Sequence, residues 1–194
     1  MLSISEFAER LSSIPEPDFT HENILQFLRE NRVDAATLAP YTYFCSEHYT
    51  RNLIHKTDLF ELISICWDSG QKSPIHNHRD QNCWMAMPYG RLQVHNFRLV
   101  KKEPSTGYCE LESRNHFLLV PDSPQEVDPA EPIHQVLNLP SFQSRAVSLH
   151  IYSRPYDTCE VYDLKTNHYE DMKLVNTSEY GVLNTDMKVE KVTL

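Results

Sequence analysis

Apolar side chains recur at helical spacing in the first part of the chain, within residues 5–11 and 21–30. Ser3 and Thr20, which belong to the residue types that cap helix N-termini, stand just before these two segments. The pattern therefore predicts two short helices. Residues 34–38 are expected to form a third short helix that ends before the following proline.

From residue 59 onward the pattern changes to short apolar or alternating runs, each of the length of a β-strand. These runs are 59–67, 82–87, 91–100, 116–120, 133–138 and 145–152. Turn-forming Gly and Pro residues separate them, and this spacing predicts an all-β sandwich or barrel with the helices at one end. After Asp163 the chain becomes polar, and the alternation in 188–194 predicts an edge strand or a loosely held tail.

Length and composition favour one domain. The chain has 194 residues, of which 40% are hydrophobic and 23% charged, and this suits a single globular core. We expect one domain over 1–194, with a helical cap at 1–45, a barrel at 46–165 and a C-terminal strand or tail at 166–194.

The charge balance narrows the possible partners. The 18 Lys and Arg against 27 Asp and Glu give a net charge of −9, which repels phosphate backbones and anionic membranes. Nucleic acid and membrane are therefore not expected as partners. With four glycines, the chain has no Gly-rich loop of the kind that cradles a dinucleotide or a nucleotide phosphate.

The N-terminus and the cysteines indicate a cytoplasmic protein. The first residues are acidic and lack a basic start followed by an apolar run, so no secretory signal is expected. The chain also lacks the run of about 18 apolar residues that a membrane helix needs. Five cysteines form an odd set without a CxxC pair, and we interpret them as reduced.

Two histidines, His76 and His78, lie two residues apart just after Pro74. Side chains at i and i+2 point to the same side of an extended strand, whereas on a helix they diverge. A strand that starts near Pro74 would therefore let both imidazoles bind one metal ion. Such a pair needs a third ligand before it predicts a metal site.

The surrounding residues resemble the first motif of the cupin superfamily. Gly70, His76, His78, Cys83 and Gly90 follow its spacing, with cysteine at the position where glutamate is usual.

A later segment resembles the second cupin motif. Pro129, His134 and Asn138 match it, whereas Glu131 replaces its glycine. His134 is therefore the candidate third ligand, since three imidazoles on a small barrel are a recurrent metal arrangement. The resemblance implies a cupin fold, which is a small double-stranded β-helix, or jelly-roll, barrel.

Replacing the usual glutamate changes the expected chemistry. Three neutral imidazoles would leave a divalent ion with its whole positive charge and with adjacent open positions. Such an ion favours an anionic incoming ligand such as a thiolate, and oxygen could bind beside it. Imidazole ligands suit iron, zinc, copper or nickel, so the ligands alone leave the metal open.

Two further segments add polar side chains. Arg51, two residues after Tyr49, offers a planar fork for a carboxylate if it folds into the barrel. His150 and Tyr152 are an i, i+2 pair on a predicted strand, so both side chains share one face. Taken singly, these residues also fit plainer interpretations, as a surface charge, a core histidine and a half-buried strand residue.

The segments YTRNL, CWDSG, SPIHNHRDQNCW, EPIHQVLN and SLHIYSRPYDTC resemble the cysteine dioxygenase family, over roughly residues 40 to 165. The resemblance implies that His76, His78 and His134 bind Fe(2+). The family's reaction adds both atoms of O2 to the sulfur of L-cysteine and gives cysteine sulfinate, a step of cysteine catabolism.

The same resemblance implies roles for the remaining polar residues. Arg51 and Tyr49 take the positions that bind the substrate carboxylate, and His150 and Tyr152 take those of a pair that acts beside the metal. Cys83 is available for the thioether bond to tyrosine that some members carry, and the sequence leaves its formation open. We expect a monomer whose partners are the small molecules L-cysteine and O2.

Three alternatives stay open. The first is a dioxygenase for another small thiol, such as 3-mercaptopropionate, although relatives that act on it usually have glutamine in the place of Arg51. The second is a non-catalytic cupin that binds a metal or a small ligand. The third is a β-barrel interaction module with incidental histidines.

One position departs from the family pattern. Ser153-Arg154-Pro155 stands where Ser-Pro-Pro, with a cis bond before the first proline, is common. A cis bond before a residue other than proline costs about 3 kcal/mol, so a trans bond and a strained cis bond are the alternatives. Because Arg154 follows Tyr152 closely, its charge is expected near the pocket, where it would alter substrate preference.

Overall fold

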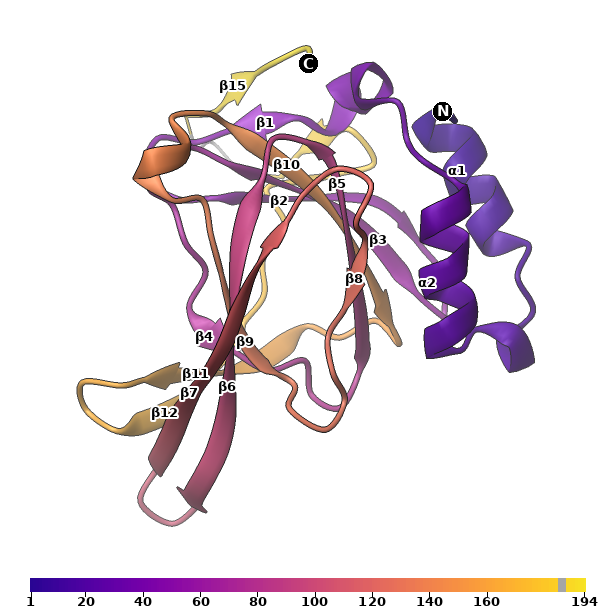
Figure 1. The fold of residues 1–194 in the computed structure, drawn as a ribbon. Coiled ribbons are helices and arrows are strands. Elements are labelled where there is room, and N and C mark those ends of the chain that lie inside the picture. The colour runs from indigo at the N-terminus through magenta and orange to yellow at the C-terminus, as the bar shows by residue number, and fades with distance from the viewer. Residues whose placement is uncertain (185–187) are drawn as a thin grey trace.

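The computed structural model describes residues 1–184 and 188–194, and within them the chain begins with two α-helices (Figure 1). The helical elements are α1 (Ile4–Ser12), η1 (Glu16–Asp18), α2 (His21–Glu30), η2 (Ala35–Tyr41) and η3 (Pro140–Phe142), of which those labelled η are 3-10 helices. The Ser3 hydroxyl accepts a hydrogen bond from the Glu6 N–H, and the Glu6 carboxylate accepts one from the Ser3 N–H, so α1 begins with a capping box. Thr20 caps α2 through its side chain. Both predicted helices are confirmed.

The third predicted helix forms as the 3-10 helix η2 and runs on through Pro40 instead of ending before it. Proline lacks the backbone N–H, and in a short 3-10 helix this removes a single hydrogen bond, so the helix continues through Pro40.

The β-strands outnumber the helices in the described chain, and most of them belong to two larger sheets. The seven-stranded sheet has the order β14 (Val182–Leu183), β13 (Ser178–Glu179), β2 (Thr50–Lys56), β3 (Glu61–Trp67), β10 (Ala146–Ser153), β5 (Asn82–Tyr89) and β8 (Gln125–Glu126). A second group of strands closes into a ring in the order β11 (Thr158–Asp163), β12 (His168–Lys173), β7 (Tyr108–Leu119), β6 (Leu92–Glu103), β9 (Ile133–Leu137) and β4 (Ile75–His76). This arrangement confirms the prediction of an all-β barrel with N-terminal helices.

Strands β3 and β10 are buried on both faces, which explains their nearly unbroken apolar sequences. One face packs against the helices, where Leu62 and Ile151 share a core with Phe7 and Leu11. The other face meets strands β6 and β9 in a second, interior core. Because successive strand residues point to opposite faces, every second residue of β10 points into the interior.

The C-terminal part of the chain belongs to the fold more closely than the sequence indicates. Strand β12 lies beyond residue 165, where we expected the barrel to end, and pairs along its whole length with β11. Its outer side chains are exposed, which explains its polar composition. For 188–194 we expected an edge strand or a loosely held tail, and the structure has the short strand β15 (Glu190–Lys191), which pairs with β1 (Tyr43–Phe44). Residues 185–187 lie outside the described chain.

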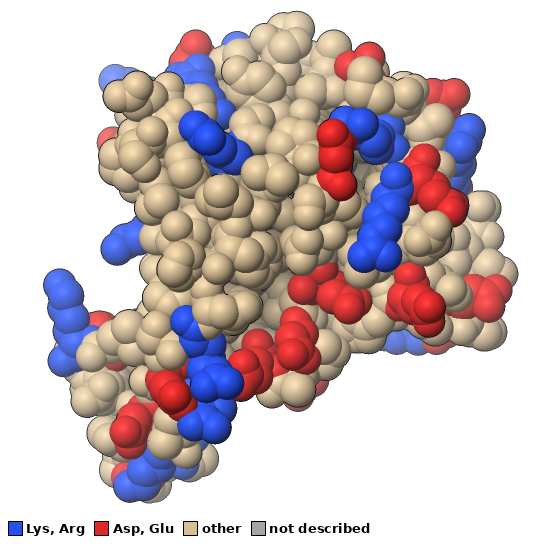
Figure 2. Space-filling model, viewed as in Figure 1, with Lys and Arg blue, Asp and Glu red and all other residues tan. Residues whose placement is uncertain are grey.

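Charged side chains gather at the end of the long β6–β7 hairpin, where acidic and basic groups lie side by side (Figure 2). Arg98 pairs there with Glu112, and Lys101 Nζ lies 2.5 Å from Glu103 Oε1. The hairpin end therefore presents mixed charge in spite of the net charge of −9. None of the helices in the described chain combines the length and the apolar character that a membrane crossing needs.

Candidate metal centre

Three histidines from two distant parts of the chain meet inside the barrel. His76 ends β4 and pairs in register with His134 on the antiparallel strand β9, and His78 lies two residues beyond the end of β4. The ring centroids are 4.7 Å apart for His76 and His134, 4.8 Å for His78 and His134 and 5.2 Å for His76 and His78. One nitrogen atom from each ring lies within 4.8 Å of the corresponding atoms of the other two rings, so the three imidazoles can bind a common ion.

Within the described chain, some ring nitrogens of these imidazoles have no hydrogen-bond partner. His76 Nδ1 lies 3.0 Å from the Pro74 carbonyl oxygen, which can only accept, so Nδ1 holds the proton and Nε2 keeps its lone pair. Among the described residues, no group hydrogen-bonds either ring nitrogen of His78 or Nδ1 of His134. A buried polar atom left without a hydrogen-bond partner costs about 1–3 kcal/mol, and a bound metal ion would remove that cost at the one nitrogen of each ring that it binds.

Burial also keeps the three rings uncharged. It lowers the pKa of His76 to about 4 and those of His78 and His134 well below 6.5, because a charged ring inside the barrel would lose its hydration. Neutral imidazole is the form that binds metals. The donor set therefore fits a divalent ion of the iron, zinc, copper or nickel class.

A series of hydrogen-bonded side chains lies along the interior face of β3 and β10 and ends at the histidine cluster. The Trp67 Nε1–H donates to Ser148 Oγ at 3.0 Å, Ser148 Oγ lies 2.9 Å from His150 Nε2, and His150 Nδ1 lies 3.1 Å from the Tyr152 hydroxyl. The Tyr152 ring lies 5.6 Å from that of His78. The structure thus brings the predicted His150–Tyr152 pair to the cluster, already oriented by two residues that the sequence analysis missed.

Burial shapes the protonation of this pair. It lowers the pKa of His150 to about 3 and raises that of Tyr152, so the imidazole and the phenol are both neutral near pH 7. Cys83 faces Tyr152 directly across the β5–β10 ladder and is fully buried. Tyr156, a residue without a sequence signal of its own, places its ring at 5.3 Å from that of Tyr152.

Arg51 enters the same interior from β2. Its guanidinium carbon lies 5.6 Å from the centre of the Tyr152 ring, and its side chain is 11% exposed. Tyr49, two residues earlier, stacks on Trp67 with a centroid distance of 4.6 Å. A surface pocket of about 450 Å³ opens beside both residues and is bordered by 172–177, so the C-terminal region forms part of its wall.

A buried carboxylate, which the sequence analysis missed, faces Arg51. Glu61 Oε1 lies 4.0 Å from Arg51 Nη2, Glu61 Oε2 lies 3.8 Å from Lys56 Nζ, and the Glu61 side chain is 4% exposed. Burial raises the pKa of Glu61, while Arg51 and Lys56 oppose that shift. A glutamate inside the otherwise apolar run 59–67 was the available signal.

Arg154 lies away from the site, contrary to our expectation. The Ser153–Arg154 peptide bond is cis. The guanidinium pairs with Glu16 beside α1 and donates to the Asp58 carbonyl oxygen at 3.2 Å. The side chain is 53% exposed, so its charge is directed to solvent and not to the histidine cluster.

Comparisons with known proteins agree on one family. A profile of the cysteine dioxygenase type I family matches residues 14–165. Cysteine dioxygenase type 1 of Bos taurus is 30% identical over 162 residues, which cover 83% of this chain and 78% of the bovine protein. The protein of the same name from Danio rerio is 29% identical over 161 residues, covering 82% and 77% of the two chains.

Solved structures align more loosely. A Klebsiella pneumoniae protein with a double-stranded β-helix domain aligns with a TM-score of 0.43 at 12% identity, over 59% of this chain and 79% of that protein.

We expect the metal-free protein to lose stability as the pH falls from 6.5 towards 5. The pKa values of His76 and His150 in the folded chain, about 4 and about 3, lie below the 6.5 of an ordinary histidine. The unfolded chain therefore binds more protons in this range, and each such histidine lowers the free energy of unfolding by up to about 1.4 kcal/mol per pH unit. Urea unfolding at several pH values, with a chelator present, measures the slope.

Two variants serve as a matched pair for this measurement. His150→Gln should reduce the slope by the share of one histidine, whereas His116→Gln, at an exposed position, should leave it unchanged. A free energy of unfolding that stays constant between pH 6.5 and 5 would contradict the neutral, buried state of the rings.

Proposed function

The chain belongs to the cysteine dioxygenase type I family, and we propose that it oxidises the sulfur of L-cysteine with O2 to cysteine sulfinate at a single Fe(II) ion. In this proposal His76, His78 and His134 bind the iron. The observation that supports it best is the convergence of three neutral, buried imidazoles beside a buried arginine. The first feature suits a divalent ion and the second suits a carboxylate, and a small amino acid with a thiol needs both.

Arg51 and Tyr49 hold the substrate carboxylate in this proposal. Guanidinium binds carboxylate through two parallel hydrogen bonds, which fix both the position and the orientation of the bound group. In the described chain, Arg51 Nε has no hydrogen-bond partner, so a donor remains for an incoming anion. Arg51 thereby sets how far the thiol reaches towards the three imidazoles.

His76, His78 and His134 would hold a divalent ion, which would supply the positive charge that favours the thiolate form of the substrate and the redox chemistry that its oxidation by O2 needs. The protein contributes mainly by positioning, since substrate and oxygen are held in one enclosed site. The translational and rotational entropy of bringing them together is therefore already lost on binding and no longer adds to the barrier of the reaction. The net reaction adds one O2 to one thiol and needs no further reductant.

Tyr152 acts as an oriented hydrogen-bond donor in this scheme. With the Ser148 hydroxyl donating to His150 Nε2, the proton on Nδ1 is donated to the phenol oxygen, and the phenol proton is then free for the substrate. A thioether between Cys83 Sγ and the Tyr152 ring would form with loss of one hydrogen from each residue, with O2 as the two-electron oxidant that takes both, and it would hold the phenol in a single rotamer. The direct opposition of the two residues in neighbouring strands supports this link.

Oxygen consumption by the Fe(II)-loaded protein with a panel of thiols tests the proposed function. Cysteine should be consumed with the highest kcat/KM and yield the sulfinate, because it alone combines the thiol, amine and carboxylate. Cysteamine lacks the carboxylate and 3-mercaptopropionate lacks the amine, so both should react more slowly.

Arg51→Ala is the matched variant for this panel. It should raise KM for cysteine at least roughly tenfold and change KM for cysteamine little, since a lost charge-assisted bidentate contact corresponds to about 1.5–3 kcal/mol. Faster turnover of 3-mercaptopropionate than of cysteine would contradict the assignment of cysteine as the substrate. Absence of thiol-dependent oxygen uptake by the iron-loaded protein would favour a non-catalytic cupin.

Glu61→Gln should lower KM for cysteine. Glu61 is the counter-ion of Arg51 when no substrate is bound, so it competes with the substrate carboxylate for the same guanidinium. Removing its charge should lower KM roughly fivefold, or about 1 kcal/mol, and lower the melting temperature of the substrate-free protein, because a buried Arg51 is left unpaired.

Lys56→Gln is the control for this substitution. It removes the other cation that faces Glu61 but leaves the Arg51–Glu61 contact in place, so KM should change less than twofold. If Glu61→Gln leaves KM unchanged or raises it, Glu61 does not compete for Arg51.

A further inference from the structure

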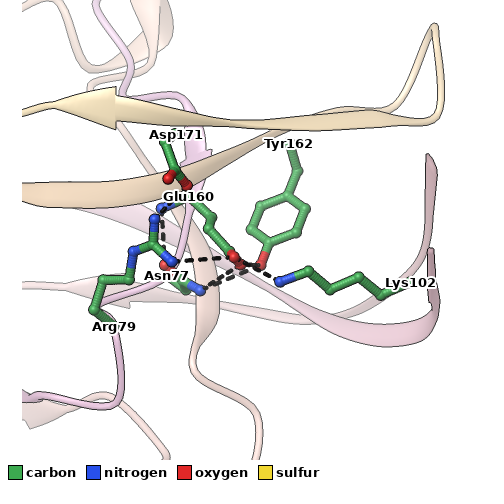
Figure 3. Close-up of polar contacts among 6 residues, drawn as sticks. All are labelled: Asn77, Arg79, Lys102, Glu160, Tyr162 and Asp171. Carbon is green, nitrogen blue, oxygen red and sulfur yellow. Dashed lines mark hydrogen bonds and ion pairs between the residues drawn. The ribbon is translucent and has the colours of Figure 1, made fainter. Parts of the chain in front are cut away.

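Outside the histidine cluster, a buried glutamate gathers four polar side chains (Figure 3). Glu160, on β11, is 7% exposed. Its Oε2 accepts hydrogen bonds from Asn77 Nδ2 at 2.9 Å and from the Tyr162 hydroxyl at 2.7 Å. Its Oε1 accepts from Lys102 Nζ at 2.6 Å and from Arg79 Nη1 at 3.3 Å. Two cations and two neutral donors thus compensate the buried charge.

Glu160 holds Asn77 through its main chain as well. The Asn77 N–H donates to the Glu160 carbonyl oxygen at 3.2 Å, and the Glu160 N–H donates to Asn77 Oδ1 at 3.0 Å. Together with the side-chain bond, three hydrogen bonds join these two residues. Asn77 is therefore anchored to β11 on both its backbone and its side chain.

The anchored residue stands between two of the three candidate ligands. His76 and His78 flank Asn77, and their rings meet His134 while the Asn77 side chain lies in the Glu160 cluster. Strand β4 ends at His76, so regular strand pairing does not extend to His78. The chain then turns through Arg79 and Asp80, both at positive φ.

The second cation of the cluster strengthens the same segment. Arg79 follows His78 directly, and its guanidinium contacts both Glu160 and Asp171, on β11 and the neighbouring β12. The histidine-bearing segment is thus tied to these strands on each side of His78, at Asn77 and at Arg79. Charge-assisted bonds to a buried carboxylate are stronger and more directional than bonds between neutral groups.

We propose that Glu160 is a positioning residue of the metal centre, which fixes the spacing of the His76 and His78 rings through Asn77 and so raises the affinity for a divalent metal. The inference rests on the proposed function only in treating the three histidines as metal ligands. Residues that orient metal ligands typically change metal affinity by about 10- to 100-fold when they are removed.

Titration of the metal-free protein with Co²⁺, followed by its visible absorption, tests this proposal. Glu160→Gln preserves the size of the side chain but loses the charge and one acceptor, and it should raise the Kd for Co²⁺ at least roughly tenfold. Glu112→Gln is the matched control, because Glu112 pairs with Arg98 on the exposed part of the β6–β7 hairpin. It should leave the Kd unchanged.

A double-mutant cycle separates positioning from general stability. Asn77→Ser removes the side-chain amide that Glu160 binds and should weaken Co²⁺ binding similarly, and the double variant should be weakened by less than the product of the two single effects. If Glu160→Gln does not fold, the Asn77→Ser variant alone tests the proposal, and its Kd for Co²⁺ should rise by the same roughly tenfold factor.

Three results would overturn the proposal. They are an unchanged Kd for a folded Glu160→Gln variant, a lowered melting temperature without any change of Kd, and fully multiplicative effects in the cycle. Failure of the unaltered protein to bind Co²⁺ would overturn the metal site itself and with it the proposed function. Normal Co²⁺ binding by both Glu160→Gln and Asn77→Ser would overturn this inference alone.

Discussion

The removal of three imidazoles from water is the constraint on which the rest of the structure depends. In solution a histidine is partly protonated near neutral pH, and a protonated ring cannot bind a metal. Inside the barrel the rings of His76, His78 and His134 lose hydration, so their pKa values fall and their lone pairs stay free. The same burial leaves ring nitrogens of His78 and His134 without partners in the described chain, a cost that a bound ion would offset.

The fold meets this constraint because side chains alternate between the two faces of a few strands. The side of β10 that carries Leu149 and Ile151 packs on the helices, whereas the side that carries His150 and Tyr152 faces the histidine cluster. The helical cap therefore covers the opposite side of the sheet on which the site is built. A shift of one residue in the register of β10 would exchange these two faces and remove the site together with the core.

Local signals were sufficient for much of this arrangement. The helices follow from apolar spacing and capping residues, the His76–His78 pair follows from strand periodicity, and His134 follows from motif spacing. Contacts between distant segments were not predictable: Asn77 and Lys102, two partners of Glu160, lie far from it in the sequence, in segments whose contact with β11 no local pattern specifies. The prediction that Arg154 lies near the pocket was wrong for the same reason, since its ion-pair partner Glu16 is far away in the sequence.

X-ray absorption at the iron edge of the Fe(II)-loaded protein tests the central claim most directly, because it counts the imidazoles bound to the ion. The account predicts a first shell that contains three imidazole nitrogens at about 2.1 Å, and two in the His134→Ala variant. A first shell with two or fewer imidazoles in the unaltered protein, or a spectrum that His134→Ala does not change, would contradict it.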